Sequence, residues 1–271
     1  MDVQAIRFYI FLGVFVLMVI LEALIPRHRT VDSKLRRFGI NLGITGVNIV
    51  IARVLLGAAA VGAAQFAENQ GWGILNWTEF PPMVELVFAV VFMDFMIYVQ
   101  HVVVHMIPFF WRFHIVHHSD LDLDVSSGLR FHPVEIIASM LFKIILVLGL
   151  GPSPLAVLAF EAILNGMAMF SHSNIKLPDH VDRALRKVIV TPDMHRIHHS
   201  VEVNETNSNY GFNLSIWDRF LGTYIPEGKR PQPEIVIGVQ QFRRPSEVGF
   251  TELLKMPFEL HNPRYFSGDL R

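Results

Sequence analysis

The stretch MVELVFAVVFMDFMIYVQHVVVHMI, residues 83–107, decides how this chain folds. It is apolar and long enough to cross a bilayer, which takes about 20 helical residues. It also ends with two histidines, His101 and His105, that are four residues apart. Residues at this spacing share one face of a helix. The stretch therefore predicts a membrane-spanning helix that carries two imidazoles on one side of its last turns.

The composition of the whole chain is that of a membrane protein. Its 271 residues are 52% hydrophobic and 17% charged, whereas soluble domains average about 25% charged residues. A net charge of −1 gives no indication of a nucleic-acid surface. The chain has no cysteine, which excludes disulfides, iron–sulfur clusters and thiolate ligands. A metal ion would therefore need histidine or carboxylate ligands.

Four further apolar stretches predict membrane helices. Residues 8–25 and 39–65 precede the opening stretch, and residues 134–150 and 153–171 follow it, separated by the turn sequence GPSP. We interpret residues 8–25 as a retained membrane helix, because the first 25 residues lack the basic start and cleavage site of a signal peptide. Buried core helices are the alternative. Because the last pair is short, we expect a hairpin that returns to its starting side.

Basic residues predict the orientation. The loop at residues 27–37 holds five Lys and Arg residues, whereas residues 66–82 hold none. The positive-inside rule places the first loop in the cytoplasm. Residues 108–133 and 172–271 then lie on the same side, together with all the histidine clusters. We therefore predict an all-α, polytopic membrane helix bundle with a cytoplasmic, histidine-rich, metal-binding cap that contains helices and loops but no sheet.

Eleven of the 13 histidines lie between residues 101 and 199. In HxxxH and HxxHH motifs, at least two imidazoles share a helix face and can reach one point. Imidazole suits zinc, copper, iron and nickel, and eight ligands exceed what one ion of four to six ligands can use. The count therefore favours two metal ions. The three clusters are His101 and His105; His114, His117 and His118; and His195, His198 and His199.

These motifs, taken in order, closely resemble the membrane-bound fatty acid hydroxylase/sterol desaturase superfamily. They are HVVVH, WRFHIVHHSD, RFHPVE, FSHSN and TPDMHRIHHS…NYGFNLSIWDRFLGTY, spread over about residues 85–225. The resemblance implies a non-haem diiron centre that uses O2 to hydroxylate or desaturate a lipid C–H bond. It implies that the eight clustered histidines are iron ligands. His172 matches a further frequent ligand, and His132 matches a recurrent His-Pro position; for both, a hydrogen bond to a ligand is the alternative.

Three other residues are candidates for the site. Asp94 lies on one helical stripe with Tyr98, His101 and His105. We predict that its carboxylate accepts a hydrogen bond from a ligating imidazole; a polar contact between helices is the alternative. Asn209 and Tyr210, in the sequence NYG, match a position of the family and would orient a ligand or line the substrate channel. Asp120 and Asp193 are expected to support ligands or to cap helices.

We expect one integral-membrane domain over residues 1–271, with N-terminal spans at 1–82, the hydroxylase-like catalytic region at 83–225 and a cytoplasmic tail at 226–271. The substrate would be a lipid, such as a sterol or fatty acyl compound, that enters from the bilayer. A separate electron-transfer protein would supply electrons, because no dinucleotide-binding fingerprint is present. The absence of a C-terminal retrieval signal favours a bacterial plasma membrane.

Two alternatives remain open at this stage. The same diiron scaffold can give another outcome, such as cleavage of an ether bond, and the motif spacing does not distinguish these reactions. A membrane metal transporter is the second alternative, because polar residues inside membranes also mark ion pathways. The clustering of the histidines at one end of the spans disfavours transport.

Overall fold

The structure is a computed structural model that describes residues 3–56 and 59–259. Its regular elements in those ranges are helices, and only isolated bridges such as Ile189 with Leu214 pair extended backbone. The predicted all-α class is therefore confirmed. The long helices are α1 (Val3–Leu24), α2 (Lys34–Leu56), α3 (Ala59–Gln70), α4 (Pro82–Met106), α6 (Pro133–Leu150) and α7 (Pro154–His172).

Shorter elements connect and cover these helices. They are η1 (Ile74–Trp77), α5 (Pro108–His118), η2 (Ser127–Leu129), α8 (Asp179–Leu185), α9 (Pro192–His198), α10 (Val203–Thr206), α11 (Ile216–Phe220), η3 (Gln232–Glu234), η4 (Pro245–Glu247) and α12 (Phe250–Glu259). Proline is the first residue of several helices, including α4, α5 and α9. Its fixed φ suits that position and gives these helices defined starts.

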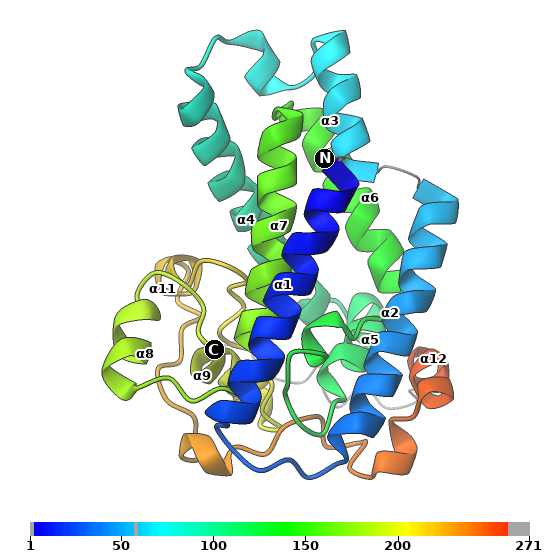
Figure 1. Ribbon diagram of the computed structural model, residues 1–271, viewed down its shortest axis with the longest axis vertical. Coiled ribbons are helices and arrows are strands. Elements are labelled where there is room, and N and C mark those ends of the chain that lie inside the picture. Colours follow the sequence, from blue (N-terminus) through cyan, green and yellow to red (C-terminus); the bar gives the residue numbers. More distant parts are fainter. Residues whose placement is uncertain (1–2, 57–58, 260–271) are drawn as a thin grey trace.

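Five segments are long and apolar enough to cross a membrane, and they stand side by side as a bundle (Figure 1). They correspond to the five predicted stretches, with α2 and α3 together forming the second. Only 11% of the apolar window in α1 and 39% of that in α4 is buried. Because these apolar faces are not covered by protein, they suit contact with lipid chains. The chain is thus an integral membrane protein.

The GPSP turn joins α6 to α7 as the sequence predicts. Gly151 ends α6 with a φ of 70°, a left-handed conformation that favours glycine. The Ser153 hydroxyl accepts a hydrogen bond from the backbone N–H of Ala156 at 3.2 Å and so caps α7. Glu85 of α4 accepts hydrogen bonds from the N–H and hydroxyl of Ser153. The hairpin is therefore fastened to α4 at its tip.

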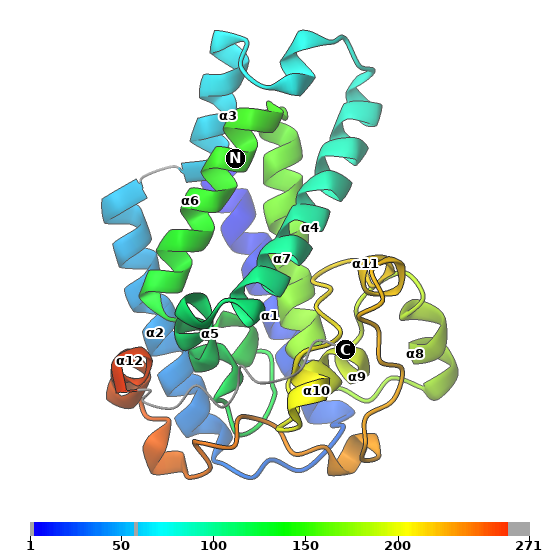
Figure 2. The ribbon, with the colours of Figure 1, turned by 180° about the vertical axis from the view of Figure 1, so that it is seen from behind.

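Apart from η1, the short helices gather at one end of the bundle and form the cap, defined here as residues 107–131 and 173–259. Figure 2 shows α5 below α6, and α8 to α10 beside the lower end of α7. The loop between α1 and α2 lies at this end, whereas α3 and η1 lie at the other (Figure 1). The structure thus brings the predicted basic loop and all three histidine clusters to one end.

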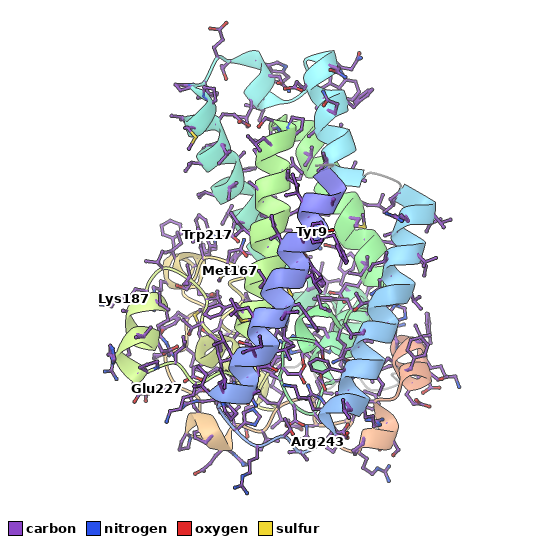
Figure 3. The ribbon with its side chains drawn as sticks, in the orientation of Figure 1. Tyr9, Met167, Lys187, Trp217, Glu227 and Arg243 are labelled. Carbon is purple, nitrogen blue, oxygen red and sulfur yellow. The ribbon has the colours of Figure 1, made fainter. Side chains whose placement is uncertain are left out.

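Asp94 connects α4 to the cap. Its carboxylate accepts hydrogen bonds from the Trp217 indole N–H at 2.8 Å and from the backbone N–H of Leu214 at 3.2 Å. Figure 3 shows Trp217 at the edge of the cap that is nearest the bundle. These contacts replace the predicted bond from Asp94 to an imidazole, so that expectation is corrected. Asp94 positions the cap and does not contact a ligand.

A buried ion-pair network fixes the loop after α5 against α2. The Arg37 guanidinium forms ion pairs with Asp120 at 2.8 Å and with Asp124 at 2.8 Å, and it donates a hydrogen bond to the backbone oxygen of Asp122 at 2.7 Å. Burial is the largest single influence on the pKa of Asp120 and raises it, but the charges of Arg37 and Arg130 and the hydrogen bonds from Arg37 and Ser127 together outweigh burial and hold that pKa well below its usual range. Asp120 is therefore a structural anion and not a ligand support.

Replacing Arg37 tests this network. In Arg37→Met, three buried aspartates lose their shared cation. Removing one partner of a buried pair costs about 3–5 kcal/mol, which for a chain of this size lowers the melting temperature by on the order of 10 °C. Thermal unfolding of the detergent-purified protein measures this. Arg29→Met is the control, because Arg29 is exposed; an equal effect of the two variants would contradict the role of the network.

Candidate metal centre

Nine histidines meet where four helices end at the cap, and none is more than 5% exposed. The last turns of α4 and α5 and the end of α7 supply six of them, and α9 with its C-cap supplies three. They form two groups in which one nitrogen of each ring lies within 4.8 Å of the others. The first group is His101, His105, His114, His118 and His198, and the second is His117, His172, His195 and His199.

The two groups adjoin each other. The imidazole rings of His118 and His199 stack with centroids 4.3 Å apart, and His117 precedes His118 in the chain. Each HxxHH motif thus supplies both groups, because its adjacent histidines point in different directions from the helix. His172, whose role the sequence left open, lies inside the second group.

Protein oxygens fix the tautomers of several of these rings. The Nδ1 atoms of His101, His172 and His198 each lie 2.7 Å from a backbone carbonyl oxygen, and that of His117 lies 3.2 Å from one. A carbonyl oxygen only accepts, so each Nδ1 carries the proton and each Nε2 presents a lone pair. This is the arrangement in which imidazole binds a metal ion.

In the first group, every Nε2 is buried and has no hydrogen-bond partner among the described residues. Buried polar atoms without partners are rare in folded proteins and call for an explanation such as a bound ion. Five such atoms that converge on one point share one explanation. The donor set, which is all imidazole nitrogen, fits a transition-metal ion.

The second group gives an independent indication. Nε2 of His172 lies 3.1 Å from Nε2 of His117 and 3.0 Å from Nε2 of His195. The protons of His117 and His172 are already on Nδ1, so the first of these contacts places two lone pairs against each other. Two nitrogens that each lie about 2.1 Å from one ion have a similar mutual separation. A cation between them removes the repulsion, and the group fits a second metal ion.

Burial favours the neutral form of five of these rings. It is the largest cause that lowers the pKa values of His117, His118, His195 and His199 well below the usual value, and neighbouring imidazoles lower them further. Burial likewise lowers the pKa of His198 to about 3. Neutral imidazole is the form that coordinates metals, so at neutral pH these five rings need not lose a proton before metal binding.

Glu135 is a member of the site that sequence reasoning missed. Its carboxylate accepts a hydrogen bond from Nδ1 of His114 at 2.6 Å, and the carboxylate is nearly buried. It lies in the first turn of α6, within the quoted motif RFHPVE. The signal was available, because a carboxylate inside an apolar, membrane-spanning stretch is functional by default.

His132, from the same motif, does not join either group. Its Nδ1 accepts a hydrogen bond from the N–H of Val134 at 3.2 Å, and its Nε2 lies 3.4 Å from the Leu254 backbone oxygen. It therefore caps α6 and contacts α12. The expectation that His132 is a metal ligand is corrected, since both of its nitrogens are directed elsewhere.

Asn209 and Tyr210 both contribute to the site through backbone geometry. Asn209 has a φ of 50° and its side chain bonds both the N–H and the oxygen of Ile225. This anchors the loop that presents the Tyr210 carbonyl to His101. The Tyr210 ring also packs against His105 and His198. Asp193, by contrast, pairs with Arg27 at 2.8 Å.

A cavity of about 150 Å³ adjoins the first histidine group. His101, His114 and Glu135 are among its lining residues, and Phe131, Ala168 and Phe212 add apolar walls. A second cavity of about 240 Å³ lies beside it between α4, α5 and α6. Its lining is almost wholly apolar, and it shares Gln100, Val104 and Glu135 with the first. An apolar molecule in the bilayer therefore has space next to the histidines.

The profile of the Fatty acid hydroxylase family matches residues 86–223. This chain belongs to that family. The matched region begins in α4 and ends after α11, so it contains all nine clustered histidines. Within this family region, the resemblance inferred from the motifs is confirmed.

Named relatives are enzymes that act on lipids. The chain is 35% identical to Ornithine lipid hydroxylase OlsE of Rhizobium tropici over 154 residues, covering 54% of this chain and 43% of the relative. It is 31% identical to human Alkylglycerol monooxygenase, covering 51% and 30%, and 23% identical to human Cholesterol 25-hydroxylase, covering 55% and 59%. The chain thus matches less than two thirds of each relative's length. No solved structure matches it significantly.

Metal content tests the assignment of ligands. In His118→Ala, a nitrogen of the first group is lost, and we expect the purified protein to hold less metal than the wild type. In His132→Asn, the helix cap is retained, and we expect an unchanged metal content. Elemental analysis of both variants, purified in parallel, gives the comparison. If both variants lost the same amount of metal, the assignment of His118 as a ligand and of His132 as a helix cap would be wrong.

Glu135→Gln tests the support of His114. The amide is the same size but carries no charge, so the bond from the imidazole becomes weaker. Losing such a partner typically lowers metal affinity about 10–100-fold. Competition with a chelator measures the affinity. Glu79→Gln is the matched control, because Glu79 is exposed on the opposite end of the bundle; a Glu135→Gln protein with wild-type affinity would refute the role.

Proposed function

We propose that this protein is a membrane-bound, O2-dependent oxidoreductase that holds two iron ions and hydroxylates or desaturates a C–H bond of a lipid. The observation that carries the proposal is the double set of buried Nε2 atoms, five in one group and four in the other. Membership of the Fatty acid hydroxylase family supports an iron-dependent reaction with O2 over a zinc-dependent hydrolysis. The lipid-hydroxylating relatives support a lipid as the substrate.

Each histidine group would hold one ion. The first would use the five imidazoles of its group, and the second would use His117, His172, His195 and His199. Iron bound at this nitrogen-rich centre would supply the activation of O2 that an unreactive C–H bond requires. The contribution of the chain is to hold the ligands in fixed tautomers, to exclude water and to orient one carbon of the substrate.

The cavities support a lateral route for the substrate. A lipid chain would enter the apolar cavity between α4, α5 and α6 and reach the first histidine group past Val104 and Glu135. Phe131 and Phe212 would restrict its movement near His101 and His114. Binding in this closed, apolar space would remove water from the reacting carbon and so limit side reactions.

The orientation and the electron source are parts of the same proposal. The five basic residues at 27–37 favour a cytoplasmic cap, and a bacterial plasma membrane suits the bacterial relative. Two electrons for each turnover would come from a separate redox protein, which would dock on the cytoplasmic side. Residues 1–271 would act as one domain, with 1–82 as N-terminal spans, 83–225 as the catalytic region and 226–271 as the tail.

Two other activities use the same features differently. Ether cleavage would follow hydroxylation of a carbon next to an ether oxygen, and Alkylglycerol monooxygenase among the relatives makes this outcome worth testing. Metal transport would need polar residues along the whole bundle. The histidine groups instead lie together at one end of the bundle and do not line the spans along their length.

Growth with 18O2 tests the proposal. Bacteria that express the wild-type chain and bacteria that express His105→Ala are compared by mass spectrometry of their total lipids. We expect a lipid that gains one 18O atom, or that loses two hydrogens, only with the wild type. No changed lipid under iron-replete conditions, together with a purified protein that holds zinc and no iron, would contradict the proposal.

A further inference from the structure

Three charged side chains meet inside the apolar part of the bundle. The Arg7 guanidinium of α1 lies 2.6 Å from the Glu161 carboxylate of α7, and the Lys143 ammonium of α6 lies 3.5 Å from the other oxygen of that carboxylate. All three lie within segments that can span a membrane. Glu161 is 9% exposed and Lys143 is 16% exposed at the side chain. Such residues in a membrane are costly and usually functional.

The charges of this cluster do not balance. Two cations share one carboxylate, which leaves one positive charge in excess. Glu135 is the next acidic residue on α6, eight residues and about 12 Å away along the helix, and its carboxylate already accepts a bond from His114. In a medium of low dielectric, an uncompensated charge is unfavourable. The cluster is therefore suited to an additional anion.

The excess charge is accessible from the cavity of the candidate site. Lys143 lines the same cavity as His101 and His114 and lies about two helical turns along α6 from Glu135. Gln100, Ser139 and Asn165 line the cavity as well and supply neutral hydrogen-bonding groups. The Ser139 hydroxyl donates to Gln100 at 3.5 Å. The lining of the cavity thus combines histidines of the first group with neutral polar groups and one positive charge.

We propose that Lys143 binds an anionic oxygen group of the lipid substrate, either a carboxylate or a phosphate ester. This inference rests on the proposed function and narrows its substrate class. The anionic group would compensate the excess charge of the cluster, and the Glu161 carboxylate would compete with it for Lys143. The reacting carbon would lie near His114, about 12 Å from the anionic group, because eight helical residues separate Lys143 from Glu135.

Equilibrium binding to the full-length protein in phosphatidylcholine nanodiscs tests this site without any turnover. The probes are dodecanoic acid, dodecyl phosphate and dodecan-1-ol, which share one chain and differ in the end group. We expect at least one anionic probe to bind about tenfold more tightly than the alcohol. Comparing the two anionic probes identifies which source of negative charge fits.

Four variants give opposing expectations. Lys143→Met should abolish the preference for the anionic probe, and Lys143→Arg should retain it. Glu161→Gln removes the competing carboxylate and should strengthen anion binding several-fold. Lys187→Met is the control, because Lys187 lies exposed on the cap (Figure 3) and should bind the probes as the wild type does. If Lys143→Met does not fold, Lys143→Arg and Glu161→Gln decide the test.

Equal affinities of the wild type for all three probes would overturn the inference, as would weaker anion binding in Glu161→Gln. These results are independent of the oxygenase proposal, because binding needs neither O2 nor electrons. A protein that prefers anionic probes but incorporates no 18O would retain the anion site and lose the proposed reaction. A protein that oxidises a lipid but does not prefer anionic probes would retain the proposed reaction and lose the anion site.

Discussion

Buried imidazole nitrogens that face one another as lone pairs repel each other unless a cation lies between them. This constraint organises the protein. Four helix ends bring nine histidines together, and backbone carbonyls hold the proton of His117 and His172 on the nitrogen that faces away. The close Nε2 contact between those two rings is then favourable only around an ion. The fold is arranged to impose that geometry.

The rest of the structure keeps the helix ends in place. Arg37 draws three aspartates of the loop after α5 together, and Asp94 fastens the cap to α4. Gly128 permits close packing near the second group, because a Cβ atom there would lie 2.7 Å from the Ala168 oxygen that fixes His172. These contacts lie outside the histidine groups. They supply the rigidity that a site of many neutral ligands requires.

Much of this could be predicted from the sequence. Hydropathy located five spans because apolar runs of the required length have few alternatives, and the helical period placed His101 with His105. The number of histidines in the motifs predicted more than one group of ligands, and the structure contains two such groups. The prediction that all the histidine clusters lie at one end of the bundle followed from the basic residues in a single loop. In each case, a local pattern carried the information.

The errors concern contacts between residues that are distant in the sequence. Asp94 shares a helical stripe with His101, but its partner is Trp217, 123 residues later, and no local pattern reveals that pairing. His132 was grouped with the ligands because of its motif, whereas its first role is to cap the following helix. Glu135 meets His114, 21 residues earlier, across the boundary between two helices, and the histidine spacing does not reveal that contact. Tyr210 contacts His101 through its backbone carbonyl. Because every residue has a carbonyl, the sequence gives no signal for this role.

The most direct test of the account is anomalous X-ray diffraction, at the iron absorption edge, from crystals of protein purified from iron-replete cells. The account predicts two anomalous peaks per chain, one inside each histidine group, with His118 and His199 between them. A single peak, two peaks outside these groups, or a signal at the zinc edge alone would contradict it.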